Sequence, residues 1–293
     1  MRKKGTTNKL IVFYLTPAVI AYSFFSVVPI ALAAFYGFFE WSGGKISSFV
    51  WFKNYQELLL NPDFWNAFKN NIIFVIGCCV GQVGIGFLFS MYLMGKKARF
   101  KKIFQGALFI PCLLAPIVVG FIWTQVFNAR YGLLNLLFEK VGLGFLARDW
   151  LGDPTYVVSS MLIPHIWQWI GFYVIVFLAA FQGLPESILE VAEIDGATGV
   201  KKILYVILPL MRDTIMVSLT LCISGTMKVF DHIFIMTGGG PGRASEVLSL
   251  YVYNNTFRNF RFGYGSAGSV TILMISLIII FVVRKLLIRG TNE

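Results

Sequence analysis

The chain has 293 residues, of which 57% are hydrophobic and 13% are charged, and its formal net charge is +11 at pH 7. A soluble domain of this length would carry far more charged side chains, so the composition excludes the soluble globular classes and places the chain in a lipid bilayer. The positive charges follow a pattern typical of membrane topology and indicate no nucleic-acid partner. All four cysteines fall inside apolar segments, where we expect them to be small apolar fillers.

A helix needs about 20 apolar residues to cross the hydrocarbon core of a bilayer. Six segments meet or approach this length, and no repeat or linker interrupts them, so residues 1–293 are predicted to form a single transmembrane domain. The first apolar segment is too long for the core of a secretory signal, so we expect it to remain as a helix. The predicted class is therefore all-α integral membrane, with six spans at about Leu10–Phe39, Phe68–Met94, Phe104–Phe127, Tyr156–Phe181, Leu210–Met236 and Tyr264–Val283.

The basic residues predict how these helices are oriented. Fifteen Lys and Arg residues fall on one side of the predicted membrane and nine on the other. Because cytoplasmic loops are richer in Lys and Arg, the first side is predicted to be cytoplasmic, and with it both termini and the loop at residues 185–209. The fifteen residues are Arg2, Lys3, Lys4, Lys9, Lys96, Lys97, Arg99, Lys101, Lys102, Lys201, Lys202, Arg212, Arg284, Lys285 and Arg289.

The polar loop between the fourth and fifth spans has the pattern of a helix, a bend and a second helix. Pro185 and Glu186 suit a first helical turn, where a missing N–H costs nothing and a carboxylate meets the positive end of the helix dipole. Gly196 suits the end of this helix, because glycine tolerates a left-handed conformation. A second helix is predicted to start near Thr198 and to enter the next span, with Pro209 at the join.

The same loop resembles the cytoplasmic loop in the membrane subunits of binding-protein-dependent ABC importers. That family motif reads E-A-A, three residues, G, nine residues, I, one residue, L-P. Val191 and Val206 replace Ala and Ile in an otherwise matching pattern, and an ordinary charged loop between helices is the alternative interpretation. The matching positions in this chain are Glu190, Val191, Ala192, Gly196, Val206, Leu208 and Pro209.

In the resembled family this loop forms a coupling helix that sits in a groove of the ATPase subunit. The resemblance implies that Glu190 and Glu193 make polar contacts there, that Ala192 allows close approach, and that Gly196 sets the bend. The predicted ATPase-coupling residues are Glu190, Ala192, Glu193, Asp195, Gly196, Leu208 and Pro209.

The fourth span combines polar and aromatic side chains on one helical face. His165, then Gln168 or Trp169, and then Phe172 recur at steps of three and four residues. Hydrogen-bonding groups next to flat aromatic rings suit a sugar, whose hydroxyl groups need partners and whose C–H faces pack on rings. A face that only packs against another helix would show the same pattern.

The fifth span adds further candidates for a substrate site. Lys228 and Asp231 are ionisable groups in an apolar segment, where charges are costly and often functional. They either pair with each other or contact a ligand. Thr226, one turn from Cys222, is predicted either to offer its hydroxyl group to a central cavity or to bond its own helix backbone.

The end of the fifth span carries a second resemblance. Lys228-Val-Phe-Asp231, followed by Met236-Thr-Gly-Gly-Gly-Pro241, is similar to sugar permeases of the maltose and multiple-sugar type in their short six-helix form. No catalytic residue set, no metal site and no G-x-x-x-x-G-K-[ST] phosphate loop is predicted. We therefore expect the chain to be no enzyme and to hold no cofactor, with ATP and Mg²⁺ bound by partner ATPase subunits.

Together these patterns predict one permease subunit of an ATP-driven ABC importer for an oligosaccharide or related polyol, acting by alternating access. The resemblance implies a second permease, with a heterodimer favoured, as well as two ATPase subunits and an external solute-binding protein. The predicted location is a bacterial-type cytoplasmic (inner) membrane, crossed several times. A stand-alone channel or secondary carrier is the alternative, and a membrane-embedded enzyme is a third possibility that lacks a suitable residue set.

Overall fold

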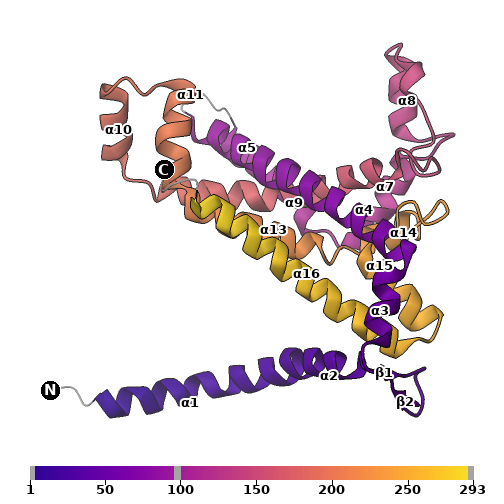
Figure 1. Cartoon of the computed structure of the whole chain (residues 1–293). Helices are drawn as coiled ribbons and strands as arrows, with labels where there is room; N and C mark the ends of the chain where they lie inside the picture. The colour runs from indigo at the N-terminus through magenta and orange to yellow at the C-terminus, as the bar shows by residue number, and fades with distance from the viewer. Residues whose placement is uncertain (1–3, 96–99, 290–293) are drawn as a thin grey trace. The chain divides into compact units, whose positions relative to one another are not determined.

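The computed structural model describes residues 4–95 and 100–289 of the chain (Figure 1). Its contacts divide into two compact units, and each unit is treated separately. Unit 1 comprises Met1–Asn61 and Val252–Met274, and unit 2 comprises Pro62–Tyr251 and Ile275–Glu293. Five of the basic residues used to predict the topology lie outside the described residues, namely Arg2, Lys3, Lys96, Lys97 and Arg99.

Unit 1 begins with a long helical segment and continues through a short hairpin. In the hairpin, Phe39 lies opposite Phe49 and Glu40 lies opposite Ser48 in antiparallel register. Its elements are α1 (Lys4–Tyr22), a π-helical segment (Ser23–Val27), α2 (Val28–Tyr36), β1 (Phe39–Glu40), β2 (Ser48–Phe49), α3 (Lys53–Leu60), a second π-helical segment (Asn254–Arg258) and the first part of α16 (Phe262–Arg289).

Two polar contacts hold α3 within unit 1. The buried amide of Asn54 donates to the carbonyl oxygens of Gly37 and Phe39, at 2.9 and 3.0 Å. The Arg261 guanidinium donates to the Glu57 carboxylate at 2.6 Å, and this hydrogen bond holds the pKa of Glu57 below its usual range. Both charged side chains are about two-fifths exposed, so this ion pair contributes little to stability. The amide of Asn54 is therefore the stronger constraint.

Unit 2 contains most of the membrane-type helices. In it α9 packs against α4, α5, α6 and α7. The helices are α4 (Pro62–Cys78), α5 (Ile85–Met94), α6 (Lys101–Phe109), α7 (Pro116–Val126), α8 (Leu133–Lys140), α9 (Val157–Gln182), α10 (Glu186–Ile194), α11 (Gly199–Lys202), α12 (Leu208–Leu210), α13 (Arg212–Thr226), α14 (Asp231–Met236) and α15 (Leu248–Tyr253). Shorter helical segments lie at Cys79–Gly84, Ile110–Leu113, Gly144–Leu146 and Ile203–Ile207.

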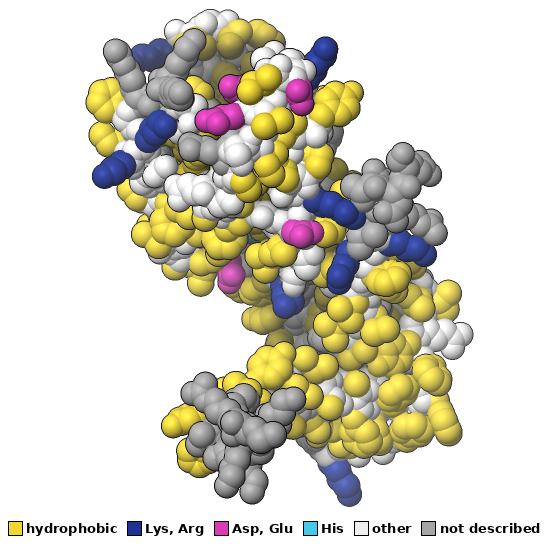
Figure 2. Space-filling model, turned by 90° about the vertical axis from the view of Figure 1, so that its left-hand side faces the viewer, with side chains coloured by type: hydrophobic (Ala, Val, Ile, Leu, Met, Phe, Trp, Pro, Cys, Tyr) yellow, Lys and Arg dark blue, Asp and Glu magenta, His cyan; other side chains and the backbone are white. Residues whose placement is uncertain are grey.

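The described residues contain five helical segments that are long and apolar enough to cross a membrane, and six if one bent pair of helices is a single span. The all-α membrane class is thereby confirmed. On the face drawn in Figure 2, most of the coloured side chains are hydrophobic, as expected where lipid replaces water. The five segments are Phe13–Tyr36, Pro62–Met94, Val157–Gln182, Arg212–Met236 and Phe262–Leu287.

The bent pair occupies the third predicted span, which is not one straight helix. Lys101–Leu113 and Pro116–Val126 meet at an angle of 103°. Pro116 opens α7, where its missing N–H is harmless, while the preceding Ala115 is extended with ψ of 136°. The bend frees the carbonyl of Leu114, and the amide Nε2 of Gln168 on α9 donates to it at 2.8 Å. The free carbonyl at the bend is thus satisfied from within the bundle, as an apolar surrounding requires.

A glycine lets α6 and α9 approach at backbone distance. A Cβ atom placed on Gly171 would lie 1.9 Å from the carbonyl oxygen of Leu108. Small residues at such crossings are typical of membrane helices, because packing and not exclusion of water holds those helices together. Gly171 therefore sets the separation between α9 and the first half of the bent pair.

Replacing Gly171 with alanine should destabilise this crossing. The added methyl group meets backbone atoms that have no rotamer to change, so we expect a loss of about 1–3 kcal/mol, as for other overpacked sites. The measurement is the thermal unfolding of the chain in detergent. Gly106→Ala is the matched control on α6, since nothing lies within 4 Å of its added Cβ. Equal unfolding temperatures for the two variants would contradict the close crossing.

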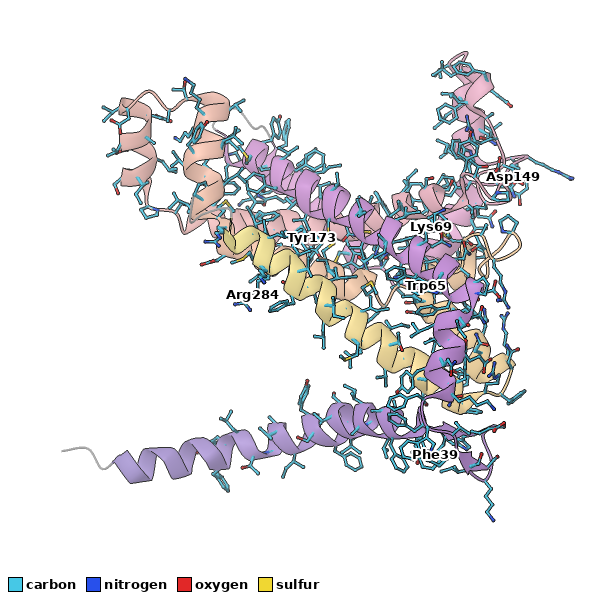
Figure 3. All side chains as sticks on the ribbon, viewed as in Figure 1. Phe39, Trp65, Lys69, Asp149, Tyr173 and Arg284 are labelled. Atoms are coloured by element: carbon cyan, nitrogen blue, oxygen red, sulfur yellow. The ribbon has the colours of Figure 1, made fainter. Side chains whose placement is uncertain are left out.

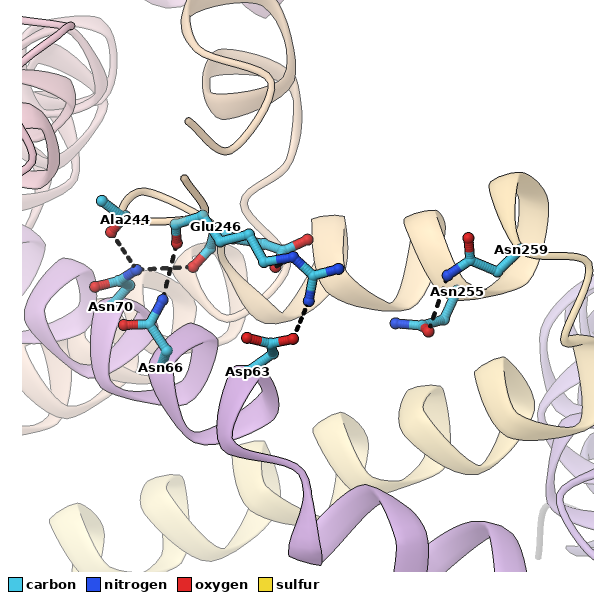
Figure 4. Close-up of polar contacts among 8 residues, drawn as sticks. Asp63, Asn66, Asn70, Ala244, Glu246, Asn255 and Asn259 are labelled. Carbon is cyan, nitrogen blue, oxygen red and sulfur yellow. Dashed lines mark hydrogen bonds and ion pairs between the residues drawn. The ribbon is translucent and has the colours of Figure 1, made fainter. Parts of the chain in front are cut away.

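A stripe of amide side chains on α4 holds the glycine-rich loop that follows α14 (Figure 4). Asn66 donates to the carbonyl of Arg243 at 2.8 Å, and Asn70 donates to those of Ala244 and Glu246 at 2.8 and 2.9 Å. The Arg243 guanidinium also pairs with the Asp63 carboxylate at the start of α4. The loop is therefore tied to α4 along two helical turns.

Asn71 extends this stripe into the interior of unit 2. Its Oδ1 accepts from the N–H of Leu248 at 2.7 Å, and its Nδ2 donates to the carbonyl of Thr226 at 3.3 Å. Asn71 is fully buried. One side chain thus joins the end of α13 to the start of α15.

Asn71→Leu should loosen the loop more than Asn66→Leu. The first change leaves the buried N–H of Leu248 without a partner, at a cost of about 1–3 kcal/mol, whereas Asn66 contributes one exposed hydrogen bond. Amide hydrogen exchange over residues 238–248 measures the difference. If exchange rises equally in both variants, Asn71 has no special role.

Candidate functional site

A cavity of unit 2 lies between α9, α13 and α14 and has a volume of about 280 Å³. Its walls combine aromatic rings with hydrogen-bonding and charged groups. α9 contributes His165, Trp169, Phe172 and Tyr173, while α13 and the residues after it contribute Leu221, Cys222, Gly225, Thr226, Lys228, Val229, Phe230, Asp231 and His232. Gln82 and Pro116 complete the lining.

The structure brings together six of the seven residues predicted to bind substrate. They come from α9 and from residues 226–231, at the junction of α13 and α14, some sixty residues later in the sequence. The residues are His165, Trp169, Phe172, Thr226, Lys228 and Asp231. His165 and Thr226 are buried, whereas Trp169, Phe172 and Asp231 are half-buried and Lys228 is exposed.

Gln168 is the seventh, and the structure separates it from the cavity. Its side chain is fully buried and bonds the Leu114 carbonyl at the bend before α7. Adjacent helical positions differ by about 100° in direction, so Gln168 and Trp169 cannot share one narrow face. The sequence left these two residues as alternatives, and the structure directs Trp169 to the cavity.

The fifth predicted span is interrupted where its charged residues lie. α13 ends at Thr226 and α14 begins at Asp231, with Met227 and Lys228 in a turn between them. Because this stretch is not helical, Lys228 and Asp231 do not have the i, i+3 spacing of a helical pair. Among the described residues no ion pair joins them, so the structure does not form the first of the two alternatives, a mutual ion pair. Both charges face the same cavity.

Thr226 was predicted either to offer its hydroxyl group to a central cavity or to bond its own helix backbone, and the structure shows further contacts. Its hydroxyl group lies 4.0 Å from the sulfur of Cys222, one turn earlier, and both residues line the cavity. Its carbonyl accepts from Asn71, which ties the helix end to α4. Asn71, which does not line the cavity, therefore holds this part of the cavity wall in place.

Five polar or aromatic lining residues were not among the predicted site residues: Gln82, Tyr173, Cys222, Phe230 and His232. Gln82 lies in a π-helical segment of the second span and donates to the carbonyl of His165 at 3.1 Å, while its Oε1 accepts from the Cys222 thiol at 3.6 Å. Tyr173 stands on α9 among the side chains of neighbouring helices (Figure 3). The available signal was polarity: Gln82 and His232 are hydrogen-bonding groups in apolar segments.

The predicted coupling loop has a well-defined turn. α10 runs from Glu186 to Ile194, Asp195 follows as its cap, and Gly196 has φ of +81°. The N–H of Ala197 donates to the carbonyl of Ala192 at 2.8 Å, and that of Gly196 donates to the carbonyl of Glu193 at 3.1 Å. These two bonds form a Schellman motif, in which glycine supplies the left-handed residue.

An ion pair joins the two helices of this loop. Lys202 on α11 donates to the Glu193 carboxylate at 2.7 Å, and Thr198 caps the start of α11 with an extended backbone. Ala192 is 9% exposed and so faces the loop interior, whereas Val191 and Ile194 are 56% and 84% exposed. Glu190, Asp195 and Gly196 are exposed, and Leu208 and Pro209 form α12 at the junction with the membrane.

Comparison with known proteins identifies the family to which the chain belongs. Residues 82–290 match the family described as "Binding-protein-dependent transport system inner membrane component". The probable ABC transporter permease protein YurN of Bacillus subtilis (strain 168) is 31% identical over 98% of this chain and 99% of its own. The multiple sugar-binding transport system permease protein MsmF of Streptococcus mutans is 31% identical over 96% of this chain and 94% of its own.

A solved structure shares the fold. It is the crystal structure of a bacterial ABC transporter involved in the import of the acidic polysaccharide alginate, with a TM-score of 0.81 and 21% identity, covering 98% of this chain and 97% of that one. The family match extends over most of the chain and includes both the cavity and the loop. The protein therefore belongs to the inner membrane component family of binding-protein-dependent transport systems, and it is an ABC transporter permease.

Proposed function

We propose that this chain is one permease subunit of an ATP-driven importer that carries a carbohydrate, an oligosaccharide or related polyol, across a bacterial-type cytoplasmic membrane. The main support for this proposal is the composition of the cavity, which combines hydrogen-bonding groups with three aromatic side chains of α9, namely Trp169, Phe172 and Tyr173. Rings for C–H faces and polar groups for hydroxyls suit a saccharide. The name of MsmF refers to multiple sugars, which agrees with this chemistry.

The size of the cavity bears on how the substrate is held. About 280 Å³ lies near the lower end of ligand sites, which span roughly 300–1,000 Å³. This chain therefore contributes one part of a site, and a second permease, favoured to be a different chain, contributes the rest. An external solute-binding protein delivers the substrate, in agreement with the family description.

The driving force comes from two partner ATPase subunits, which bind ATP and Mg²⁺. The loop from α10 to α12 acts as the coupling element, with Glu190, Ala192, Glu193, Asp195, Gly196, Leu208 and Pro209 as its predicted residues. The Schellman turn at Gly196 fixes the direction in which the chain leaves α10, so movement of an attached ATPase reaches the membrane helices. The helix bundles then alternate between outward and inward access around the site.

A stand-alone channel or secondary carrier explains the apolar helices and the charged cavity without partners. This alternative does not explain why the loop from α10 to α12 matches the family motif, or why the chain belongs to this family. The discriminating property is dependence of transport on ATP, which the channel and the secondary carrier do not require.

The coupling role is tested in the complex purified gently from its native membrane, which should contain an ATPase and a second permease. Gly196→Pro should reduce substrate-stimulated ATP hydrolysis to the unstimulated level, while the chain still inserts. Proline holds φ near −65°, far from +81°, and lacks the N–H that bonds Glu193. Gly183→Ala is the matched control, since Gly183 has φ of −86° and room for a Cβ. Retained stimulation in Gly196→Pro would argue against a rigid coupling loop.

The cavity role is tested on α9. Trp169→Ala and Phe172→Ala should each lower ATP-dependent sugar uptake about tenfold, which corresponds to about 1.4 kcal/mol, and should leave assembly of the complex intact. Trp167→Ala is the control, because Trp167 lies on α9 but outside the cavity lining. If uptake stays at the wild-type rate at both limiting and saturating sugar, Trp169 and Phe172 do not belong to the site.

A further inference from the structure

Two histidine side chains meet at the wall of the cavity. His165 on α9 and His232 on α14 have ring centroids 5.1 Å apart, with their planes at 86°. His165 is 8% exposed and His232 is 2% exposed. They are the two histidines of the chain, and the fold brings them together from positions 67 residues apart.

Each imidazole has one nitrogen without a hydrogen-bond partner in the chain. These atoms are Nδ1 of His165 and Nε2 of His232, and both are buried. A buried polar atom without a partner is destabilising. These two atoms are closed off from the cavity, but both rings line it, so a molecule inside the cavity can hydrogen-bond to the other nitrogen of each ring, Nε2 of His165 or Nδ1 of His232.

The chemistry of imidazole selects the kind of partner. A neutral imidazole has one donor and one acceptor nitrogen, and two charged imidazoles at this separation would repel each other. A hydroxyl group both donates and accepts, so it satisfies either nitrogen in either tautomer. A metal ion would need further ligands, and among the described residues no group of three or more His, Cys, Asp or Glu side chains could hold one.

The charges on this chain's part of the cavity lining bear on the charge of the ligand. Within the described lining, Lys228 is the single basic residue apart from the histidines and Asp231 is the single acidic one. No ion pair is formed between them, so each acts on the cavity contents with its own sign. An anionic sugar would gain from Lys228 and lose to Asp231, whereas a neutral sugar can hydrogen-bond to both. This chain's part of the lining therefore offers no net attraction for an acid.

We propose that His165 and His232 form a two-imidazole subsite that binds hydroxyl groups of a neutral sugar unit. This inference rests on the proposed carbohydrate importer and restricts its substrate to uncharged saccharides. It assigns His232 to the substrate site, beside the aromatic residues Trp169 and Phe172. The alginate importer that shares this fold carries an acidic polysaccharide, so the proposal separates this chain from that protein in substrate charge.

The experiment compares uptake by cells that carry the chain with uptake by cells from which it is deleted. Two probes are supplied: short neutral oligosaccharides from starch, arabinan and galactan, and short acidic ones from pectin and alginate. A saccharide whose uptake depends on the chain is its substrate. We expect this substrate to come from the neutral set.

Variants of the histidines then test the subsite on that substrate. His165→Phe and His232→Phe keep a planar ring but remove the hydrogen bonds, and should each lower the uptake rate about tenfold with unchanged amounts of chain in the membrane. His232→Gln keeps a donor and an acceptor and should restore most of the rate, which a purely structural role would not predict. Trp167→Phe, outside the lining, is the control and should transport normally.

Each of the other possible outcomes contradicts a specific part of the proposal. Dependence of an acidic saccharide on the chain overturns the restriction to neutral sugars. Wild-type rates in both phenylalanine variants show that water alone serves the two nitrogens and overturn the subsite, while the importer stands. Equal loss in His232→Phe and His232→Gln assigns His232 to packing. If uptake of no saccharide depends on the chain although it assembles with an ATPase, the carbohydrate function itself fails.

Discussion

Backbone groups inside a membrane must find hydrogen-bond partners within the protein, and this requirement organises unit 2. Its helices are interrupted at several points, and each interruption frees carbonyl or N–H groups. Amide side chains answer them: Gln168 bonds the Leu114 carbonyl, and Asn71 bonds both the Thr226 carbonyl and the Leu248 N–H. Gln82 also bonds a backbone carbonyl, that of His165 within the continuous helix α9. The cavity exists because these breaks are tolerated.

The buried polar side chains of unit 2 are of two kinds. The first kind, which includes the amides of Gln168 and Asn71, bonds backbone groups and stabilises the fold. The second kind, which includes His165 and His232, keeps unpaired nitrogens and also lines the cavity, whereas Gln168 and Ser218 have unpaired buried oxygens but do not line it. An unpaired polar atom therefore indicates a ligand site only where its side chain also lines a cavity, although most buried polar atoms are already paired.

Much of the fold was predictable from hydropathy, since segment length and apolar composition locate helices that cross a membrane. The turn at Gly196 was also predictable, because glycine after a short polar helix is a local signal. The break between Thr226 and Asp231 was not predictable, since no proline marks it and Asn71, 155 residues away, stabilises the helix end. The choice of Trp169 over Gln168 depended likewise on the bend before α7. Local residue types are enough to predict a turn, whereas contacts with residues distant in the sequence determine which face of a helix lines the cavity.

The amide stripe on α4 has a consequence for biosynthesis. Asn70 and Asn71 bond residues 174 to 177 positions later in the chain. At about 5–20 residues per second, ribosomes need roughly ten to thirty seconds to make that intervening length. During this interval α4 is already synthesised while the loop that satisfies its amides does not yet exist. Completion of unit 2 is therefore a late event, and membrane quality control meets an intermediate with unpaired polar groups on its second span.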